Sequence, residues 1–497
     1  METLRELVRF TTSVTNKEPY FFDEQMADTK LYQLYDGVLS GKYNNDEEAS
    51  QDLYGLPASN MAFQKLKERF RKRLTAHVLQ YDYGRQFVNQ YARSLYQAMV
   101  NLLAGQVLKM KGYDNSAVDL LKLALEISVR YQFTDIELIS LKKLSYHAAF
   151  NGKKTLQEYY SQKIFLAEEK LKAELISDDY DQKLIVGYVR EADPENLISI
   201  AEEGYNTLKN LVKKHTSHTL TLNYYRVAIR YYHLKKDNKR VLQICDEAIQ
   251  YLQDHPHLAQ TIRFGEFALH KMENAMLMRN YELGAKIKNE CERYFSKGLQ
   301  NKLIFYEYYF MLCMHTKQYD EALRLFSEVK SDKHFGRLTE DKVEKWQIFE
   351  AYLKFVLPDK MPKARRRNTL LNDLNVYDKD KSGWFKAAIF AEIILCIQRG
   401  EYDTLISKHE ALQAYFQRHV TVRYTKRSYY FSKLIHTLIR YDFDLEKAKE
   451  IGNKFYRKLK ADVKDNDLEN IEVIPYDKLW LMLLNKVEEN EQIYTNN

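Results

Sequence analysis

The sequence is poor in cysteine, proline and glycine, with 4, 7 and 16 of these residues among 497. Few turns can therefore rely on a fixed or a positive φ, and long uninterrupted helices are favoured. The cysteines stand singly and far apart, and none forms a C-x-x-C pair. This predicts buried thiols in a reducing, cytoplasmic compartment instead of a disulfide framework, for Cys245, Cys291, Cys313 and Cys396.

Long apolar runs are also missing. No stretch of about 18 uncharged apolar residues occurs, so we expect no membrane span and no membrane partner. The first residues include Glu2, Arg5, Glu6 and Arg9, which argues against the apolar core of a signal peptide. The formal net charge is +7, and the 76 positive and 69 negative residues are mostly interleaved, as on solvated helix faces.

Motifs that carry catalysis or phosphate binding are absent as well. The sequence has no H-E-x-x-H, no G-x-S-x-G and no G-x-G-x-x-G. The fragment with Gly37, Gly41 and Lys42 resembles a phosphate loop, but its spacing is one residue short and Tyr43 replaces the required Ser or Thr. We therefore expect no enzymatic activity and no cofactor.

Metal sites are not predicted either. The run Asp378, Asp380, Ser382 and Gly383 copies the opening of a calcium loop, yet Ile389 stands where a bidentate Glu is needed. Two local histidine pairs lack further ligands at a spacing that zinc could use. We expect these histidines to be solvent-facing or satisfied by hydrogen bonds: His215 with His218, and His255 with His257.

What the sequence has in abundance is helix formers and aromatic residues, including 39 Tyr and 24 Phe. The clearest stretch runs from Leu303 to Lys330. Apolar residues at helical spacing occupy its first half, the polar run 315–318 interrupts it, and Tyr319, Ala322 and Phe326 mark one face of its second half. This pattern predicts two antiparallel helices that need neighbours like themselves to bury both faces.

Similar pairs recur from about residue 90. One has Gly112 and Tyr113 at its turn, another Gly400 and Tyr402, and weaker copies surround Tyr281 and Tyr232. The pairs resemble tetratricopeptide-type repeats of roughly 34 residues. The resemblance implies an all-α fold, a right-handed α-solenoid of antiparallel helix pairs, with a concave face that holds a protein or peptide.

The predicted organisation has three parts: an N-terminal helical module over 1–90, repeats over 91–460, and a C-terminal capping helix and tail over 461–497. We expect two interruptions of the repeats, an acidic break at Ser177–Glu195 and an irregular segment near 357–384. Within the last part, Lys478–Leu484 is predicted to be the capping helix, and the tail after about Asn485 to be frayed.

The N-terminal module contains the one charge concentration in the chain. A helix is predicted from Asn60 to Leu79, capped by Ser59 or Asn60, with an apolar stripe of Phe63, Leu66, Phe70, Leu74 and Val78. Eight cations and two carboxylates lie between Asn60 and Arg93. The candidate contact residues are Lys65, Arg69, Arg71, Lys72 and Arg73, with a second cluster at Arg365, Arg366 and Arg367.

Two interpretations of this basic helix stay open. It can be a solvated helix that packs on the first repeats or meets an acidic protein, or it can contact the phosphates of a nucleic acid. A short helix at Asp46–Leu53 followed by a turn with Pro57 gives it the outline of a helix–turn–helix, similar to DNA-binding domains that precede repeats in some bacterial activators. The sequence thus favours a non-enzymatic scaffold or regulator that binds a protein or peptide, with a DNA-binding transcriptional regulator as the alternative.

Overall fold

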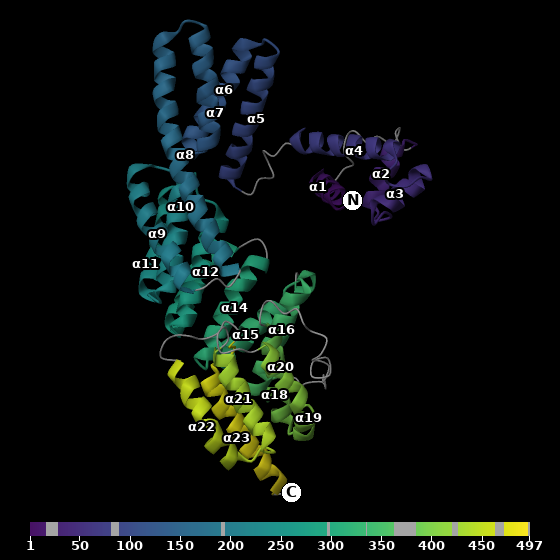
Figure 1. Cartoon of the computed structure of the whole chain (residues 1–497), viewed down its shortest axis with the longest axis vertical. Coiled ribbons are helices and arrows are strands. Elements are labelled where there is room, and N and C mark those ends of the chain that lie inside the picture. Colours follow the sequence, from purple (N-terminus) through teal and green to yellow (C-terminus); the bar gives the residue numbers. More distant parts are fainter. Residues whose placement is uncertain are drawn as a thin grey trace. The chain divides into compact units, whose positions relative to one another are not determined.

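The fold is all-α throughout the part of the chain that the computed structural model describes, which is residues 1–15, 28–80, 89–189, 194–295, 299–333, 335–361, 384–419, 426–462 and 472–495 (Figure 1). These residues contain no β-strand. In the same ranges, no helix combines the length and the apolar character that crossing a bilayer requires. The chain divides into two compact units, Met1–Tyr96 and Gln97–Asn497, and each is described separately.

The N-terminal unit is built from α1 (Glu2–Thr15), α2 (Lys30–Leu39), α3 (Asp46–Tyr54) and α4 (Met61–Gln80). Polar caps set the starts of these helices: Thr29 accepts from the amide of Tyr32, and Asn45 accepts from the amide of Glu48. Gly55 ends α3 in the left-handed region at φ +66°. All four helices contribute to one apolar core.

The second unit contains the C-terminal part of α5 and all later helices. They are α5 (Gln90–Met110), α6 (Asp114–Tyr131), α7 (Thr134–Phe150), α8 (Lys154–Val189), α9 (Pro194–Lys214), α10 (His218–Leu234), α11 (Asn238–Asp254), α12 (Thr261–Leu277), α13 (Tyr281–Cys291), α14 (Leu299–His315), α15 (Tyr319–Ser331), α16 (Glu340–Val356), α18 (Trp384–Arg399), α19 (Tyr402–Ser407), α20 (His409–His419), α21 (Lys426–Arg440), α22 (Leu445–Asp462) and α23 (Tyr476–Thr495). Short 3-10 turns follow α13 and α15: η2 (Glu292–Phe295) and η3 (Phe335–Arg337). Successive helices pack against one another in sequential pairs.

One turn geometry recurs between these helices. A residue of positive φ follows the helix, and the next amide donates to the carbonyl five residues earlier, which satisfies the last carbonyls of the helix. The positive-φ residues are Gly112, Gln132, Gly152, Lys236, Arg279, Lys317, Gly400 and Asp442. The separation between turns that enclose one helix pair is 40 residues from Gly112 to Gly152, 43 from Lys236 to Arg279 and 38 from Arg279 to Lys317. The helix pairs are thus longer than the roughly 34 residues expected from the tetratricopeptide pattern.

The hairpin predicted at Leu303–Lys330 is confirmed as α14 and α15, which pack on each other. Its expected break at 315–318 is the turn that contains Lys317. The close packing of the neighbouring helix depends on Gly284 in α13, where an added Cβ would lie 2.1 Å from Leu312 Cδ2. The hairpin belongs to an apolar core that begins in α12 and continues through α16 and α18 to α23.

The expected acidic break at Ser177–Glu195 is wrong over residues 177–189, because α8 continues to Val189. Two of the acidic side chains are paired with α10, and the exposed Asp179 pairs with Lys183 of α8 itself. Asn223 Nδ2 donates to Asp178 Oδ1 at 2.7 Å, and Arg230 forms an ion pair with Asp181. Partners from a neighbouring helix thus remove the repulsion that made the stretch look like a break.

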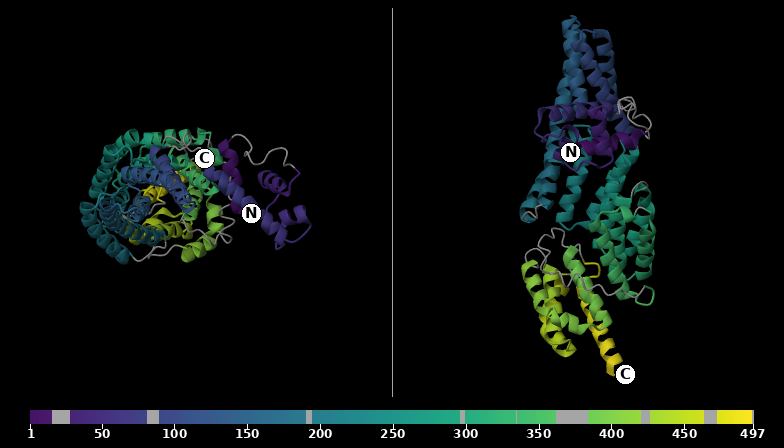
Figure 2. Two further views of the ribbon diagram at one scale, coloured as in Figure 1. Left: turned by 90° about the horizontal axis from the view of Figure 1, so that it is seen from above. Right: turned by 90° about the vertical axis from the view of Figure 1, so that its right-hand side faces the viewer.

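The frayed tail expected after Asn485 is also wrong up to Thr495. The residues Lys478–Leu484 are helical as predicted, and they form part of α23 (Tyr476–Thr495), which extends well beyond them. Val487 is fully buried, and Asn490 Nδ2 donates to the carbonyl of Ile397 at 2.8 Å. Figure 2 shows this last helix (yellow) among α18, α21 and α22, against which it packs. Most of the irregular segment expected near 357–384 lies outside the described residues.

Candidate binding surfaces

Helix α4 exposes its charged side to solvent because its apolar side is buried in the core of the N-terminal unit. Asn60 Oδ1 accepts from the amide of Ala62 at 2.9 Å, which confirms Asn60 as the N-cap. Phe63, Phe70 and Leu74 are fully buried in the core of the N-terminal unit, Leu66 is nearly so, and Val78 is half-buried. The predicted stripe is therefore confirmed, and the opposite side of the helix faces solvent.

The cations of α4 differ in how they are paired. Lys67 forms an ion pair with Asp46 of α3; burial opposes the ionisation of Asp46, but the hydrogen bond from Lys67 lowers its pKa below the ordinary value. Arg71 donates to both oxygens of Glu68 at 3.0 Å, and this hydrogen bonding lowers the pKa of Glu68. Both pairs hold their cations within the unit, so neither Lys67 nor Arg71 is fully available to a ligand.

The other predicted contact residues are less engaged. Lys65 and Arg69 are exposed, Arg73 is half-buried, and none of the three forms an ion pair with another described residue. Lys72 is exposed and lies 3.7 Å from Glu68. We define Lys65, Arg69, Lys72 and Arg73 as the basic face. The predicted cluster at Arg365, Arg366 and Arg367 lies outside the described residues.

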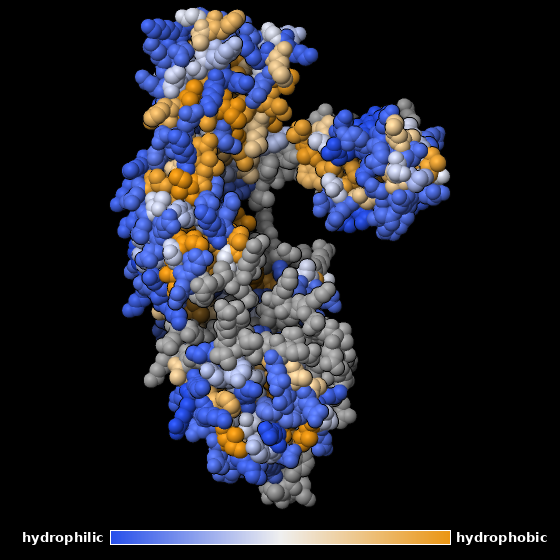
Figure 3. All heavy atoms as spheres, viewed as in Figure 1, coloured by the Kyte–Doolittle hydropathy of each residue, from blue (hydrophilic) through white to orange (hydrophobic). Residues whose placement is uncertain are grey.

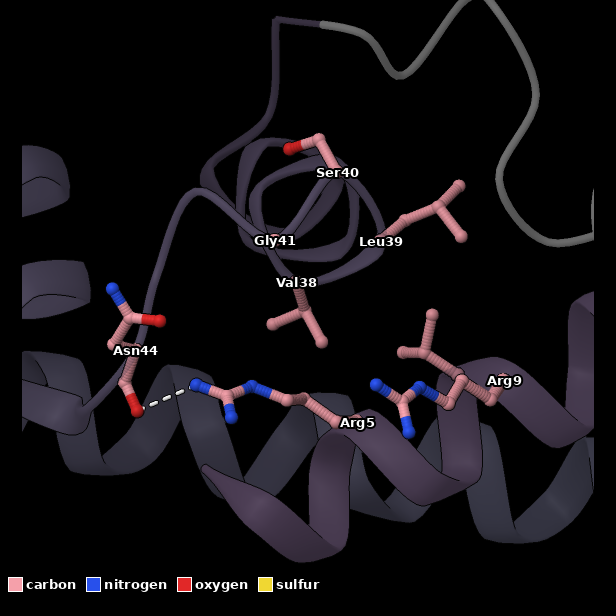
Figure 4. A pocket seen from close by; sticks show the side chains of 8 residues that line it. Arg5, Arg9, Val38, Leu39, Ser40, Gly41 and Asn44 are labelled. Atoms are coloured by element: carbon pink, nitrogen blue, oxygen red, sulfur yellow. Dashed lines mark hydrogen bonds between the residues drawn. The ribbon is translucent and has the colours of Figure 1, made fainter. Parts of the chain in front are cut away.

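A cavity of about 270 Å³ lies between α1 and the end of α2 (Figure 4). Arg5 crosses it and donates from Nη2 to the carbonyl of Tyr43 at 2.8 Å and to that of Asn44 at 2.5 Å. Arg9, one turn further along α1, lines the same cavity and is exposed. Through these two hydrogen bonds, Arg5 ties α1 to the loop before α3.

A second surface, which the sequence did not reveal, is apolar. Of the 28 exposed large apolar side chains in the described ranges, 20 lie between Met99 and Tyr188, on α5–α8 and their turns. Only four follow from residue 194 onward, at Ile262, Ile304, Ile406 and Leu481. Figure 3 shows apolar atoms spread over these four helices. The concentration is too strong to be the ordinary scatter of single surface residues.

The packing of α5–α8 explains this exposure. Gly105 of α5 lies against Leu121 of α6, α6 packs on α7, and α7 packs on α8. From α8 onward, several helices also pack on a next-but-one neighbour: α8 packs on α10, α12 on α14, α19 on α21 and α21 on α23. Within the described residues, no comparable packing joins α5 to α7 or α6 to α8. These helices therefore form a single layer, and much of their apolar surface is uncovered.

The most exposed part of the layer is one end, where the turns α5–α6 and α7–α8 lie. Met110, Tyr113, Tyr146 and Phe150 are 78%, 64%, 69% and 76% exposed, and we call them the apolar tip. The antiparallel course of the helices brings both turns to this end (Figure 1).

Two histidines of the local pairs, His218 and His255, contact Tyr251, and all four cysteines are buried. His218 is buried, with Nδ1 3.1 Å from the hydroxyl of Tyr251, and Nδ1 of His255 lies 2.9 Å from the carbonyl of Tyr251. No group of three or more metal-ligating side chains occurs in the described ranges. Burial raises the pKa of all four cysteine thiols, to about 12 for Cys313 and about 11 for Cys396. The calcium-like run at 378–383 lies outside the described residues.

A buried polar cluster near the C-terminus also escaped sequence reasoning. Arg427 and Glu472 are 1% and 0% exposed, and Nε and Nη2 of Arg427 donate to the two carboxylate oxygens at 2.6 and 2.9 Å. His315 Nε2 donates to the carbonyl of Glu472 at 2.6 Å. The groups are 45 and 157 residues apart, so no spacing rule could find them. Their full burial indicates a role in stability.

This cluster predicts a loss of stability in acid. Burial lowers the pKa of His315 to about 4, and Arg279 and Lys478 lower it further against the hydrogen bond to Glu472, which raises it. Because the unfolded value is about 6.5, the stabilisation is complete above that pH and is lost as pH falls toward 4. From pH 7 to pH 5 the loss is about 2 kcal/mol. Urea titrations at both pH values should show a smaller pH dependence for His315→Gln; an unchanged dependence would contradict this assignment.

Comparison with protein-family models, with curated proteins and with solved structures gave no match. The function therefore has to be inferred from the two surfaces, the basic face of α4 and the apolar layer α5–α8.

Proposed function

We propose that this chain is a non-enzymatic helical-repeat protein, an α-solenoid scaffold or regulator, that binds a protein partner on the apolar layer α5–α8. The observation that carries the proposal is the concentration of exposed apolar side chains on this layer, 20 of 28 in the described ranges. Exposed apolar patches of this extent mark interaction sites on soluble proteins, because burial of the patch is the dominant source of binding free energy. The apolar tip supplies the aromatic and methionine side chains that are enriched at protein interfaces.

The tyrosines of α9 and α10 differ from those of the apolar tip, and this difference supports placing the partner on α5–α8. The resemblance to tetratricopeptide-type repeats implied that a concave face of the repeats receives the partner. In α9 and α10, however, the rings pack on one another: Tyr205 is 6% exposed and stacks on Tyr231 with ring centroids 5.1 Å apart. Its hydroxyl also accepts from the hydroxyl of Tyr232 at 3.1 Å. These tyrosines are occupied in helix packing, whereas those of the apolar tip are free to contact a partner.

Charge also favours a partner held mainly by apolar contact. Between Gln90 and Val189 the sequence has thirteen Lys or Arg and twelve Asp or Glu residues, so the layer is close to neutral. Several of these charges are paired within the layer, including Lys142 with Glu168 and Lys170 with Glu137. Such a surface has little long-range attraction for a polyanion or a polycation. A partner with a complementary apolar patch fits it best.

The proposal predicts site-specific cross-linking in cells. A photoreactive phenylalanine analogue at Phe150, in the tip, should cross-link to a second protein with defined stoichiometry. The same analogue at Ile262 of α12, which is 57% exposed, is the matched control and should give no such product. Equal products at both positions, or none at Phe150, would rule out the layer as a docking surface. Cross-links between two copies of this chain would show that the partner is a second copy of the same protein.

A further inference from the structure

The basic face of α4 is independent of the apolar layer and presents a different chemistry. Lys65, Arg69 and Arg73 repeat at i, i+4 and i+8, and Lys72 lies beside them. At 1.5 Å per residue the face extends over about 12 Å along the helix. The buried stripe fixes which way these side chains point, so the charges form a rigid row and not a flexible tail.

The row is costly in the isolated protein. Lys65 faces Arg69, and Arg69 faces Arg73, each at the spacing where like charges destabilise a helix by about 0.2–0.5 kcal/mol per pair. The single carboxylate of α4, Glu68, is already engaged by Arg71 and lies 3.7 Å from Lys72. No carboxylate of the described chain pairs with Lys65, Arg69 or Arg73, so the repulsion is not relieved within the unit. A polyanion laid along the face would relieve it.

The polar character of the middle of α4 indicates which polyanion fits. Between Ala62 and Val78, all of which the structure describes, no large apolar side chain is exposed, and the exposed apolar residues of the helix, Met61 and Leu79, lie at its two ends. Protein interfaces depend on a few buried aromatic or aliphatic anchors for most of their affinity. Nucleic acids, in contrast, can be bound almost entirely through phosphate contacts and counterion release. We infer that the basic face binds the phosphodiester backbone of a nucleic acid, with Lys65, Arg69 and Lys72 as phosphate contacts and Arg73 at its edge.

Fluorescence anisotropy of the full chain tests this inference. The probes are labelled mixed-sequence DNA duplex, RNA duplex and single-stranded DNA, each titrated at low and moderate salt. Three phosphate contacts on duplex DNA predict a slope of about −2.7 in log affinity against log salt, or about 40-fold weaker binding from 50 to 200 mM salt. The DNA and RNA arms show which backbone geometry the face prefers.

The variants are chosen so that folding does not confuse the result. Lys65→Glu/Arg69→Glu/Lys72→Glu alters exposed side chains, and should abolish binding while the helical circular dichroism is unchanged. Lys111→Glu/Lys153→Glu/Lys154→Glu makes the same charge change at exposed positions near the apolar tip and should bind as the wild type does. Equal loss in both variants would mean a response to net charge alone and would overturn the inference. So would absence of binding by the wild type to all three probes, or binding that salt does not weaken.

Discussion

Replacing Arg427 with Met is expected to lower the free energy of unfolding of the unit Gln97–Asn497 by about 3–5 kcal/mol. The carboxylate of Glu472 is 0% exposed and takes two hydrogen bonds from the Arg427 guanidinium, which also donates to the carbonyl of Leu459 at 2.7 Å. Without the guanidinium a buried negative charge is left without its compensating partner. The carbonyl of Leu459 loses a donor at the same time, which adds to the loss.

Urea unfolding followed by tryptophan fluorescence measures this loss directly, since Trp346, Trp384 and Trp480 all belong to this unit. The double replacement Arg427→Met/Glu472→Met removes both charges and should be more stable than Arg427→Met alone, because an apolar pair avoids the desolvation of a lone ion. A single variant within about 1 kcal/mol of the wild type would show that the pair contributes little.

The second large effect concerns Gly37 of α2. A Cβ at this position would lie 2.0 Å from Cε2 of Tyr43, so Gly37→Ala has to displace a ring that is 2% exposed. The hydroxyl of Tyr43 donates to Asp52 at 2.6 Å, and the displacement breaks this contact as well. Overpacking and the loss of the buried ring outweigh the gain in helix propensity, about 1 kcal/mol. The expected net loss is about 2–4 kcal/mol, confined to the N-terminal unit.

Because the N-terminal unit has no tryptophan, its unfolding should appear in far-ultraviolet circular dichroism without a change in fluorescence. Gly336→Ala is the matched control, as a Cβ there meets no atom within 4 Å. Identical unfolding curves for Gly37→Ala and Gly336→Ala would show that Tyr43 can move at little cost.

Most of the fold could be predicted from the helical periodicity of the apolar residues. The hairpin at Leu303–Lys330 and the turn at Gly112 could be identified because apolar spacing and a glycine coincide there. Other turns of the same geometry use Gln132, Lys236 or Arg279 at positive φ, where the sequence gives no signal. The pair length of about 40 residues was missed for this reason. The extent of α8 was missed because the partners of two of its carboxylates lie on α10.

The basic helix could be placed from sequence, but the pairing of its charges could not. The contact between Arg71 and Glu68 follows from their spacing within one helix, whereas Lys67 with Asp46 depends on how α3 packs on α4. The apolar tip was hidden for a different reason. Phe150 and Met110 have the spacing of core residues, and only the packing of α5–α8 as a single layer leaves them exposed.

The affinity of the partner cross-linked through Phe150 tests the proposed function most directly. Its dissociation constant should be measured for the wild type, for Tyr146→Glu/Phe150→Glu and for the control Ile262→Glu. Placing charges in a contact that carries about 2 kcal/mol or more should weaken binding at least ~30-fold, with the control unchanged. Dissociation constants that agree for all three proteins would contradict the assignment of α5–α8 as the docking surface.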